Sequence, residues 1–160
     1  MGSEMCIRER YKPLYPYFNS DYVIGVDVGI TNYATVAVVD VKTKRPVYTT
    51  TLSRRVHSLA NKIRKANKQV VSLQCKGRCE EAALHRRANK NRKRELAIVA
   101  AQEIAELSFN WGKALVAFED LSWIANTMQN GRWNRGELYR RTEEMVELNG
   151  GRVLKVNARN

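Results

Sequence analysis

The sequence predicts a single α/β domain, and three observations lead to that fold class. Tyr22–Asp40 has the alternation and turn of a β-hairpin, residues 54–110 have helical periodicity on both sides of a short break, and Ala114–Asp120 is a further strand-like run. The chain has 160 residues, which is the usual size of one domain with its own hydrophobic core.

The first strand places one acid among apolar and small residues. Along YVIGVDVGI the side chains alternate between faces, so Ile24 and Val26 share an apolar face while Asp27 lies between two glycines on the other. Glycine inside a strand often marks the close approach of a ligand or of another backbone. A charge in a buried strand costs free energy unless a partner offsets it. Asp27 is therefore either a hydrogen-bonded structural acid or part of a functional site.

The elements that follow predict a hairpin of strands and then a hairpin of helices. A tight turn at Thr31–Asn32 leads to a second strand, which ends at a turn signal around Lys42–Pro46. Apolar residues then recur at intervals of three and four: Val56, Leu59, Ile63, Ala66, Val70 and Leu73. After a break at Gln74–Arg78, a second helix is expected over about residues 80–110, which makes an αα-hairpin over about residues 54–110. Cys75 and Cys79 flank the break, but a C-x3-C pair alone is a weak metal signal, and no zinc is assigned.

The excess positive charge of the chain lies in the same helical segment. The net charge is +12, and Arg54 to Arg94 contains 14 Lys or Arg against 2 acids, whereas the rest of the chain carries 14 of each. Such a basic block is typical of a polyanion binder, and a solvated helical surface is the alternative. The residues predicted to bind nucleic acid are Arg54, Arg55, Lys62, Arg64, Lys65, Lys68, Arg86, Arg87, Lys90, Arg92, Lys93 and Arg94.

A second acid ends the next strand-like run, ALVAFED. Glu119 and Asp120 point to opposite faces of a strand, so at most one of them can join a site with Asp27. Glu119 is preferred because Ala117, its neighbour on the same face, is small, and Asp120 is expected to orient the following loop. Carboxylate oxygens suit Mg²⁺ or Mn²⁺, which bind through one or two carboxylates together with phosphate oxygens. Asp27 and Glu119 are therefore the predicted metal ligands and catalytic residues.

These motifs resemble those of a known nuclease family. GVDVGITNYATVAVVD is similar to the first RuvC motif of the TnpB transposon-encoded nucleases and the type V CRISPR effectors, with Asp27 at the position of the motif's aspartate. VAFEDLSW resembles their second motif, with Glu119 at its glutamate, and RWNRGELYRRTEEMVELNGGRVLKVN resembles the helix and strand that follow. The resemblance covers about Tyr22 to Asn160, and the order and spacing of the motifs are more specific than each motif alone.

The resemblance implies an RNase H-like (RuvC) mixed sheet, with the basic helical hairpin between the third and fourth strands. The strands are then expected at Tyr22–Ile30, Tyr33–Val41, Val47–Leu52, Ala114–Glu119 and Arg152–Val156. A helix over Gly136–Asn149 is expected to pack on the sheet through Leu138, Met145 and Leu148.

The family's activity implies guide-RNA-directed, Mg²⁺- or Mn²⁺-dependent cutting of target DNA. The zinc ribbon and third catalytic aspartate that follow the last strand in the family have no counterpart before Asn160, and the N-terminal recognition half is also missing. We therefore interpret residues 21–160 as a partial RuvC-like domain with two of three catalytic carboxylates, inactive alone, from an expressed fragment or a naturally shortened chain. Residues 1–20 are interpreted as a tag remnant and an irregular lead-in.

Two other function classes stay open. One is a non-catalytic module that only holds RNA or DNA. The other follows from GVDVGITN, which also resembles the first phosphate loop of actin-like ATPases and sugar kinases, although this chain is short and basic for such enzymes. Trp123 and Trp133 flank a loop rich in Asn, Gln and Gly, where they either stack on bases or anchor the core.

The composition also predicts where the protein works. The sequence has no apolar run long enough to span a membrane, no signal peptide and three cysteines without a disulfide spacing. These features predict a cytoplasmic protein, or a nuclear one in a eukaryote, with no membrane partner and no small-molecule substrate.

Overall fold

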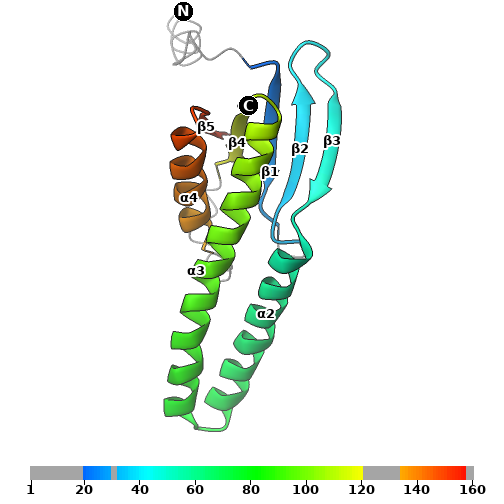
Figure 1. Cartoon of the computed structure of the whole chain (residues 1–160). Helices are drawn as coiled ribbons and strands as arrows, with labels where there is room; N and C mark the ends of the chain where they lie inside the picture. The colour runs from blue at the N-terminus through cyan, green and yellow to red at the C-terminus, as the bar shows by residue number, and fades with distance from the viewer. Residues whose placement is uncertain (1–19, 30–31, 121–133, 158–160) are drawn as a thin grey trace, which may run out of the picture.

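A five-stranded mixed sheet forms the centre of the structure, which is a computed structural model that describes residues 20–29, 32–120 and 134–157 (Figure 1). The strand order is β3-β2-β1-β4-β5. The strands are β1 (Tyr22–Asp27), β2 (Thr35–Asp40), β3 (Pro46–Thr51), β4 (Leu115–Glu119) and β5 (Val153–Val156). The first three are antiparallel neighbours, and β4 and β5 add to β1 in parallel. The predicted α/β class is confirmed, with its mixed sheet and its helical hairpin between the third and fourth strands.

Helices cover one face of this sheet. They are α2 (Arg54–Cys75), α3 (Cys79–Asn110) and α4 (Arg135–Leu148). The core joins the inward side chains of β1, β2 and β4 to α3 and α4, and its members with almost no exposed surface include Ile24, Val36, Val116, Leu96, Ile104 and Leu138. The alternation of buried and less buried residues along β1, β2 and β4 is the pattern of a sheet covered on one face. None of the helices in the described ranges is both long and apolar enough to cross a bilayer.

The helical hairpin of α2 and α3 is longer than the sheet that it accompanies. The carboxyl-terminal half of α3 lies along the sheet, whereas α2 and the first half of α3 extend beyond the sheet's end (Figure 1). The 22 residues of α2 span about 33 Å at a rise of about 1.5 Å per residue. Gly77, with φ of 73°, makes the turn at the tip, where a residue with a side chain would be strained.

The start of α2 is fixed by a residue of α3. Ser53 precedes the helix and makes no side-chain cap of its own. Instead, the Ser53 backbone N–H donates to Oε2 of Glu103 at 2.8 Å, and the Ser53 hydroxyl donates to the other oxygen of the same carboxylate. A carboxylate at a helix N-terminus also interacts favourably with the helix dipole. Glu103 therefore ties the base of the hairpin to the part of α3 that covers the sheet.

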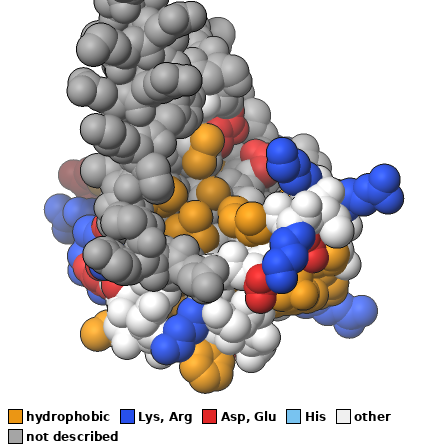
Figure 2. Space-filling model, turned by 90° about the horizontal axis from the view of Figure 1, so that it is seen from above, with side chains coloured by type: hydrophobic (Ala, Val, Ile, Leu, Met, Phe, Trp, Pro, Cys, Tyr) orange, Lys and Arg blue, Asp and Glu red, His pale blue; other side chains and the backbone are white. Residues whose placement is uncertain are grey.

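An aromatic cluster closes the opposite end of the sheet, where β1 begins. Tyr22 packs edge-on against Trp111 with ring centroids 4.9 Å apart, and Tyr48 lies 6.3 Å from the same indole ring. Figure 2 views the molecule from this end and shows hydrophobic side chains near the middle with Lys and Arg towards the margin. Because β1 begins at this end and β4 runs parallel to it, the carboxyl ends of both strands lie at the opposite end of the sheet.

Several details of the sequence prediction are wrong. The turn between β1 and β2 is longer than two residues, because the ladder ends at the pair Asp27↔Thr35 and residues 28–34 lie outside it. Leu148 does not pack on the sheet, since it is 86% exposed; Val146, on the other side of the last turn, is buried instead. The lead-in and the loop between Trp123 and Trp133 lie outside the described residues.

A polar pair lies inside the outer half of the helical hairpin. Asn89 is 3% exposed, and its amide nitrogen donates to Oδ1 of Asn67 at 2.7 Å. Asn89 occupies the same heptad position as Ala82 and Leu96, which lie one heptad before it and one heptad after it. Its own Oδ1 is buried with no hydrogen-bond partner among the described residues. A buried amide at such a position fixes the register of two helices at some cost in stability.

We expect Asn67→Ala to lower the free energy of unfolding by about 1–3 kcal/mol, because it leaves the buried Asn89 amide without its partner. Adding Asn89→Leu should restore the loss, since leucine has a similar volume and no polar group to satisfy. Urea denaturation measures both, with Asn61→Ala, an exposed asparagine on the same helix, as the control. Equal losses in Asn67→Ala and Asn61→Ala would show that the pair does not stabilise the hairpin.

Candidate metal and nucleic-acid site

The register between β1 and β4 brings the two predicted site acids together. The parallel pairs run from Val23↔Leu115 to Val26↔Phe118, and the next step of the same register sets Asp27 beside Glu119. Paired residues of parallel strands point to the same face, so both acids share the face of Gly25 and Ala117. Both strands end at these residues. The continued register therefore predicts that the acids lie side by side at the carboxyl ends of β1 and β4.

Asp27 is exposed, which corrects the expectation of a charge inside a buried strand. The acid is the last residue of β1 and lies on the face that the helices do not cover. A Cβ added at Gly25, two residues earlier on this face, would meet only the carbonyl oxygen of Ala37, at 3.9 Å. Within the described residues the backbone leaves room beside the acids, and the exposure of Asp27 means that no cation is needed to offset its burial.

Two carboxylates are a donor set of the kind that a hard divalent cation binds. Mg²⁺ is commonly held by one or two carboxylates and completes its shell with water and phosphate oxygens. Within residues 20–29, 32–120 and 134–157, no three His, Cys, Asp or Glu side chains are grouped so that they could hold a metal. The described residues therefore offer a pair of carboxylate ligands at the carboxyl ends of two neighbouring strands.

Asp120 takes a different place from its neighbour. Its backbone N–H donates to the carbonyl oxygen of Val156 at 2.7 Å, which extends the ladder between β4 and β5. Its side chain alternates to the opposite direction from that of Glu119. This arrangement agrees with the sequence argument that only one of the two acids can lie beside Asp27.

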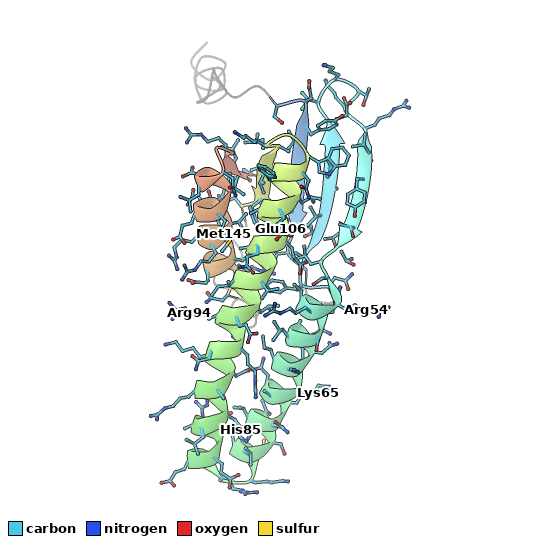
Figure 3. All side chains as sticks on the ribbon, viewed as in Figure 1. Arg54, Lys65, His85, Arg94, Glu106 and Met145 are labelled. Carbon is cyan, nitrogen blue, oxygen red and sulfur yellow. The ribbon has the colours of Figure 1, made fainter. Side chains whose placement is uncertain are left out.

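The predicted nucleic-acid-binding residues are distributed around the outside of the helical hairpin. Figure 3 shows Arg54 and Lys65 pointing away from α2 on one side and Arg94 pointing away from α3 on the other. Nine of the twelve are exposed, and Arg64, Arg92 and Lys93 are half-buried. Burial lowers the pKa of the Lys93 ammonium. The basic surface thus surrounds the hairpin and is not confined to one stripe.

Two of these arginines already contact acids. Arg55 lies 3.7 Å from a carboxylate oxygen of Glu95, and Arg94 lies 4.0 Å from one of Glu137. The same Glu137 accepts hydrogen bonds from Arg140 and Arg141, and these bonds lower the pKa of its carboxyl group. Arg94 therefore links the hairpin to α4, and the arginines and lysines nearer the tip are better placed to contact phosphates.

Sequence reasoning missed Arg135, the first residue of α4. Its Nη2 donates to the carbonyl oxygen of Val28 at 3.4 Å, directly after Asp27 in the chain. Burial raises the pKa of the Tyr33 phenol, and the positive charge of Arg135 acts in the opposite direction, which places the guanidinium near that ring. The only signal in the sequence was a basic residue at a helix start, which is too common to single out.

Comparison with solved structures identifies proteins with the same fold. A structure of the Cas12f1–sgRNA–target DNA complex matches with a TM-score of 0.65 over 89% of this chain and 37% of that chain, at 17% identity. A CRISPR–Cas12f ternary complex matches with a TM-score of 0.64 over 89% of this chain and 30% of that chain, at 16% identity. The likeness is one of fold. Neither a protein-family model nor a curated protein matches the sequence.

The matched proteins agree with the resemblance found in the sequence, because both are type V CRISPR effectors. The present chain spans only about a third of the length of each. The comparison thus supports the fold, and the role of each acid is a separate question.

We expect the chain to bind one Mn²⁺ through Asp27 and Glu119 together. Asp27→Asn and Glu119→Gln should each weaken binding at least about tenfold, the loss seen even for outer-shell partners. The double variant should lose little more than either single one, because both remove ligands of the same ion. Electron paramagnetic resonance of free Mn²⁺ measures the affinity. The control is Asp40→Asn. Asp40 is the acid that ends β2, and it lies at the opposite end of the sheet from Asp27.

An unchanged Mn²⁺ affinity in either single variant would contradict a shared ion. So would an Asp40→Asn effect as large as that of Asp27→Asn.

Proposed function

We propose that this chain is part of a divalent-metal-dependent endonuclease of the TnpB and type V effector kind, in which an RNA guide directs the cutting of DNA. The observation that supports the proposal is the parallel register between β1 and β4, whose pair Val26↔Phe118 comes one step before Asp27 and Glu119. Acids at the carboxyl ends of neighbouring strands have no need of each other for folding, since like charges side by side repel. A cation bound by both carboxylates would offset this repulsion.

The position of the basic hairpin supports a nucleic-acid substrate. The hairpin extends from the same end of the sheet at which β1 and β4 finish (Figure 1). A phosphate backbone bound along α2 and α3 would therefore lead towards the two acids. The matched Cas12f1 structure is a complex with sgRNA and target DNA, and we propose the same classes of partner for the protein to which this chain belongs.

The residues have distinct tasks in this proposal. Asp27 and Glu119 would hold Mg²⁺ or Mn²⁺, and the bound metal supplies Lewis-acid stabilisation of charge on the phosphate oxygens. The side chains of the hairpin neutralise the backbone phosphates and so fix the position of the strand. The small residues Gly25 and Ala117 leave room over the sheet for the strand to approach the acids. Full cleavage is proposed to require a third carboxylate in addition to these two.

Two alternatives make different predictions. A non-catalytic binding module would hold nucleic acid with the same affinity whether or not Asp27 and Glu119 are present. A phosphate-loop ATPase or sugar kinase would bind ATP, which calorimetry measures directly, and the proposed nuclease would not.

We expect the chain to bind single-stranded nucleic acid with a steep dependence on salt, because neutralised phosphates release counterions. Changing Arg86, Arg87 and Lys90 to Gln should reduce the slope of log affinity against log salt by about 2, at about 0.7 for each phosphate contact. Fluorescence anisotropy with a labelled oligonucleotide measures the slope. The matched control changes the exposed Lys42, Lys44 and Arg45 at the β2–β3 turn, at the other end of the molecule. Equal effects of the two triple variants would show that only net charge matters.

Cleavage of single-stranded DNA in Mg²⁺ or Mn²⁺ tests the nuclease itself. We expect slow or no cleavage by this 160-residue chain and clear cleavage when a segment that supplies a third acid is joined to it. Misplacing a reacting group by about 1 Å can cost about a hundredfold in rate, and a missing ligand should cost more. Asp27→Ala and Glu119→Ala should each abolish the activity of the longer chain.

Two results would overturn parts of this proposal. If the longer chain bound DNA but did not cut it, the non-catalytic alternative would hold. If the 160-residue chain cut DNA in an Asp27-dependent way, the third ligand would lie within it, and Asp120 would be the first residue to change.

A further inference from the structure

The guanidinium of Arg135 lies close to the strand end that carries Asp27. Arg135 begins α4, and its Nη2 donates to the carbonyl oxygen of Val28 at 3.4 Å. Residues 28 and 135 are far apart in the sequence, so this contact depends on the tertiary fold. It brings a half-buried positive charge to the residue that follows the candidate metal ligand.

The direction of the Val28 carbonyl locates the guanidinium more closely. The N–H of Val41 donates to the carbonyl oxygen of Asp21 at 2.9 Å, so the Asp21 carbonyl faces the β2 side of β1. Carbonyl directions alternate along a strand, so the Val28 carbonyl faces the β4 side. The Val28 side chain packs against the core as those of Ile24 and Val26 do, which shows that the alternation continues through residue 28.

Arg135 therefore contacts β1 on the side that faces β4. The described pairs between β1 and β4 end at Val26↔Phe118, and the Val28 carbonyl, which lies beyond them, accepts from the arginine. The guanidinium thus lies just past the end of β1, on the side of β4. These two strands end in Asp27 and Glu119.

The arginine has hydrogen-bonding capacity to spare. A guanidinium carries several N–H donors in a planar fork that matches phosphate oxygens, and the bond to Val28 is long. Two other arginines of α4 differ: Arg140 and Arg141 both donate to Glu137 and Glu144. Among the arginines of α4, Arg135 is the one that donates to the backbone at the end of β1 and not to an acid of its own helix.

We propose that Arg135 is a phosphate-binding residue of the candidate site, which contacts a non-bridging oxygen of the phosphodiester that the metal holds. This inference rests on the proposed function. In the part of the site that the described residues supply, two carboxylates and one phosphodiester carry three negative charges, and a divalent cation leaves one of these for the guanidinium to offset. The attraction between the guanidinium and the phosphate increases as negative charge develops on the phosphate oxygens.

The dinucleotide TpT with Mn²⁺ tests the proposal, because one phosphodiester reports on the site and not on the hairpin. Arg135→Met should weaken TpT binding roughly tenfold to a hundredfold, the range for a hydrogen bond to a charged group. Its Mn²⁺ affinity in the absence of TpT should stay within about twofold of the parent, and Arg135→Lys should recover part of the TpT affinity by keeping the charge. Broadening of the ³¹P resonance of TpT by Mn²⁺ measures binding at the metal. The matched control is Arg140→Met, which removes the same charge from the same helix.

The outcomes separate this inference from the proposed function. Unchanged TpT affinity in Arg135→Met, or an equal loss in Arg140→Met, would overturn the role of Arg135. A fall in thermal stability and Mn²⁺ affinity with no selective loss of TpT would also overturn it, because Arg135 would then only brace β1. If Asp27→Asn did not change Mn²⁺ affinity, the metal site would fail. A selective loss of TpT in Arg135→Met would still support phosphate binding by the arginine.

Discussion

Parallel pairing between β1 and β4 is the constraint on which the rest of the structure depends. Strands that run in the same direction cannot be joined by a tight turn, so the chain must cross over between them. Here the crossover contains β2, β3 and the whole helical hairpin. The return path of α3 supplies the cover for one face of the sheet. The same pairing sets Asp27 beside Glu119, so the core, the hairpin and the candidate site follow from one register.

The charges of the molecule are separated by this arrangement. The basic residues are on a helical hairpin that extends past the sheet, and two of the acids lie at the sheet edge from which it extends. Distance and solvent weaken the attraction between these groups, since charges more than about 10 Å apart are largely screened at about 0.1 M salt. The hairpin is thus left with most of its positive charge to attract a polyanion, while the acids are left free to attract a small cation.

Much of this could be predicted from the sequence, and the failures have physical causes. Alternation and the apolar seam predict β1, β2, β4 and the helical hairpin, whereas β3, β5 and α4 are predicted from the family resemblance. The same alternation distinguishes Glu119 from Asp120. Exposure of Asp27 was missed because a strand's length depends on where its partners end, which no single strand encodes. Leu148 was misplaced because the last turn of a helix can outrun the surface beneath it. Arg135 was missed because its role depends on contact with a residue more than a hundred positions away.

The continuity of α3 has a mechanical consequence. This helix runs without a break over 32 residues from the tip of the hairpin to Asn110, and β4 begins at Leu115. The joint between them contains Gly112 and Lys113, both with positive φ, and the lysine carries the strain of that conformation. A force on the tip of the hairpin is therefore transmitted along the stiff helix α3 to this short joint, which acts as a pivot. The element on the other side of that pivot is the strand that ends in Glu119.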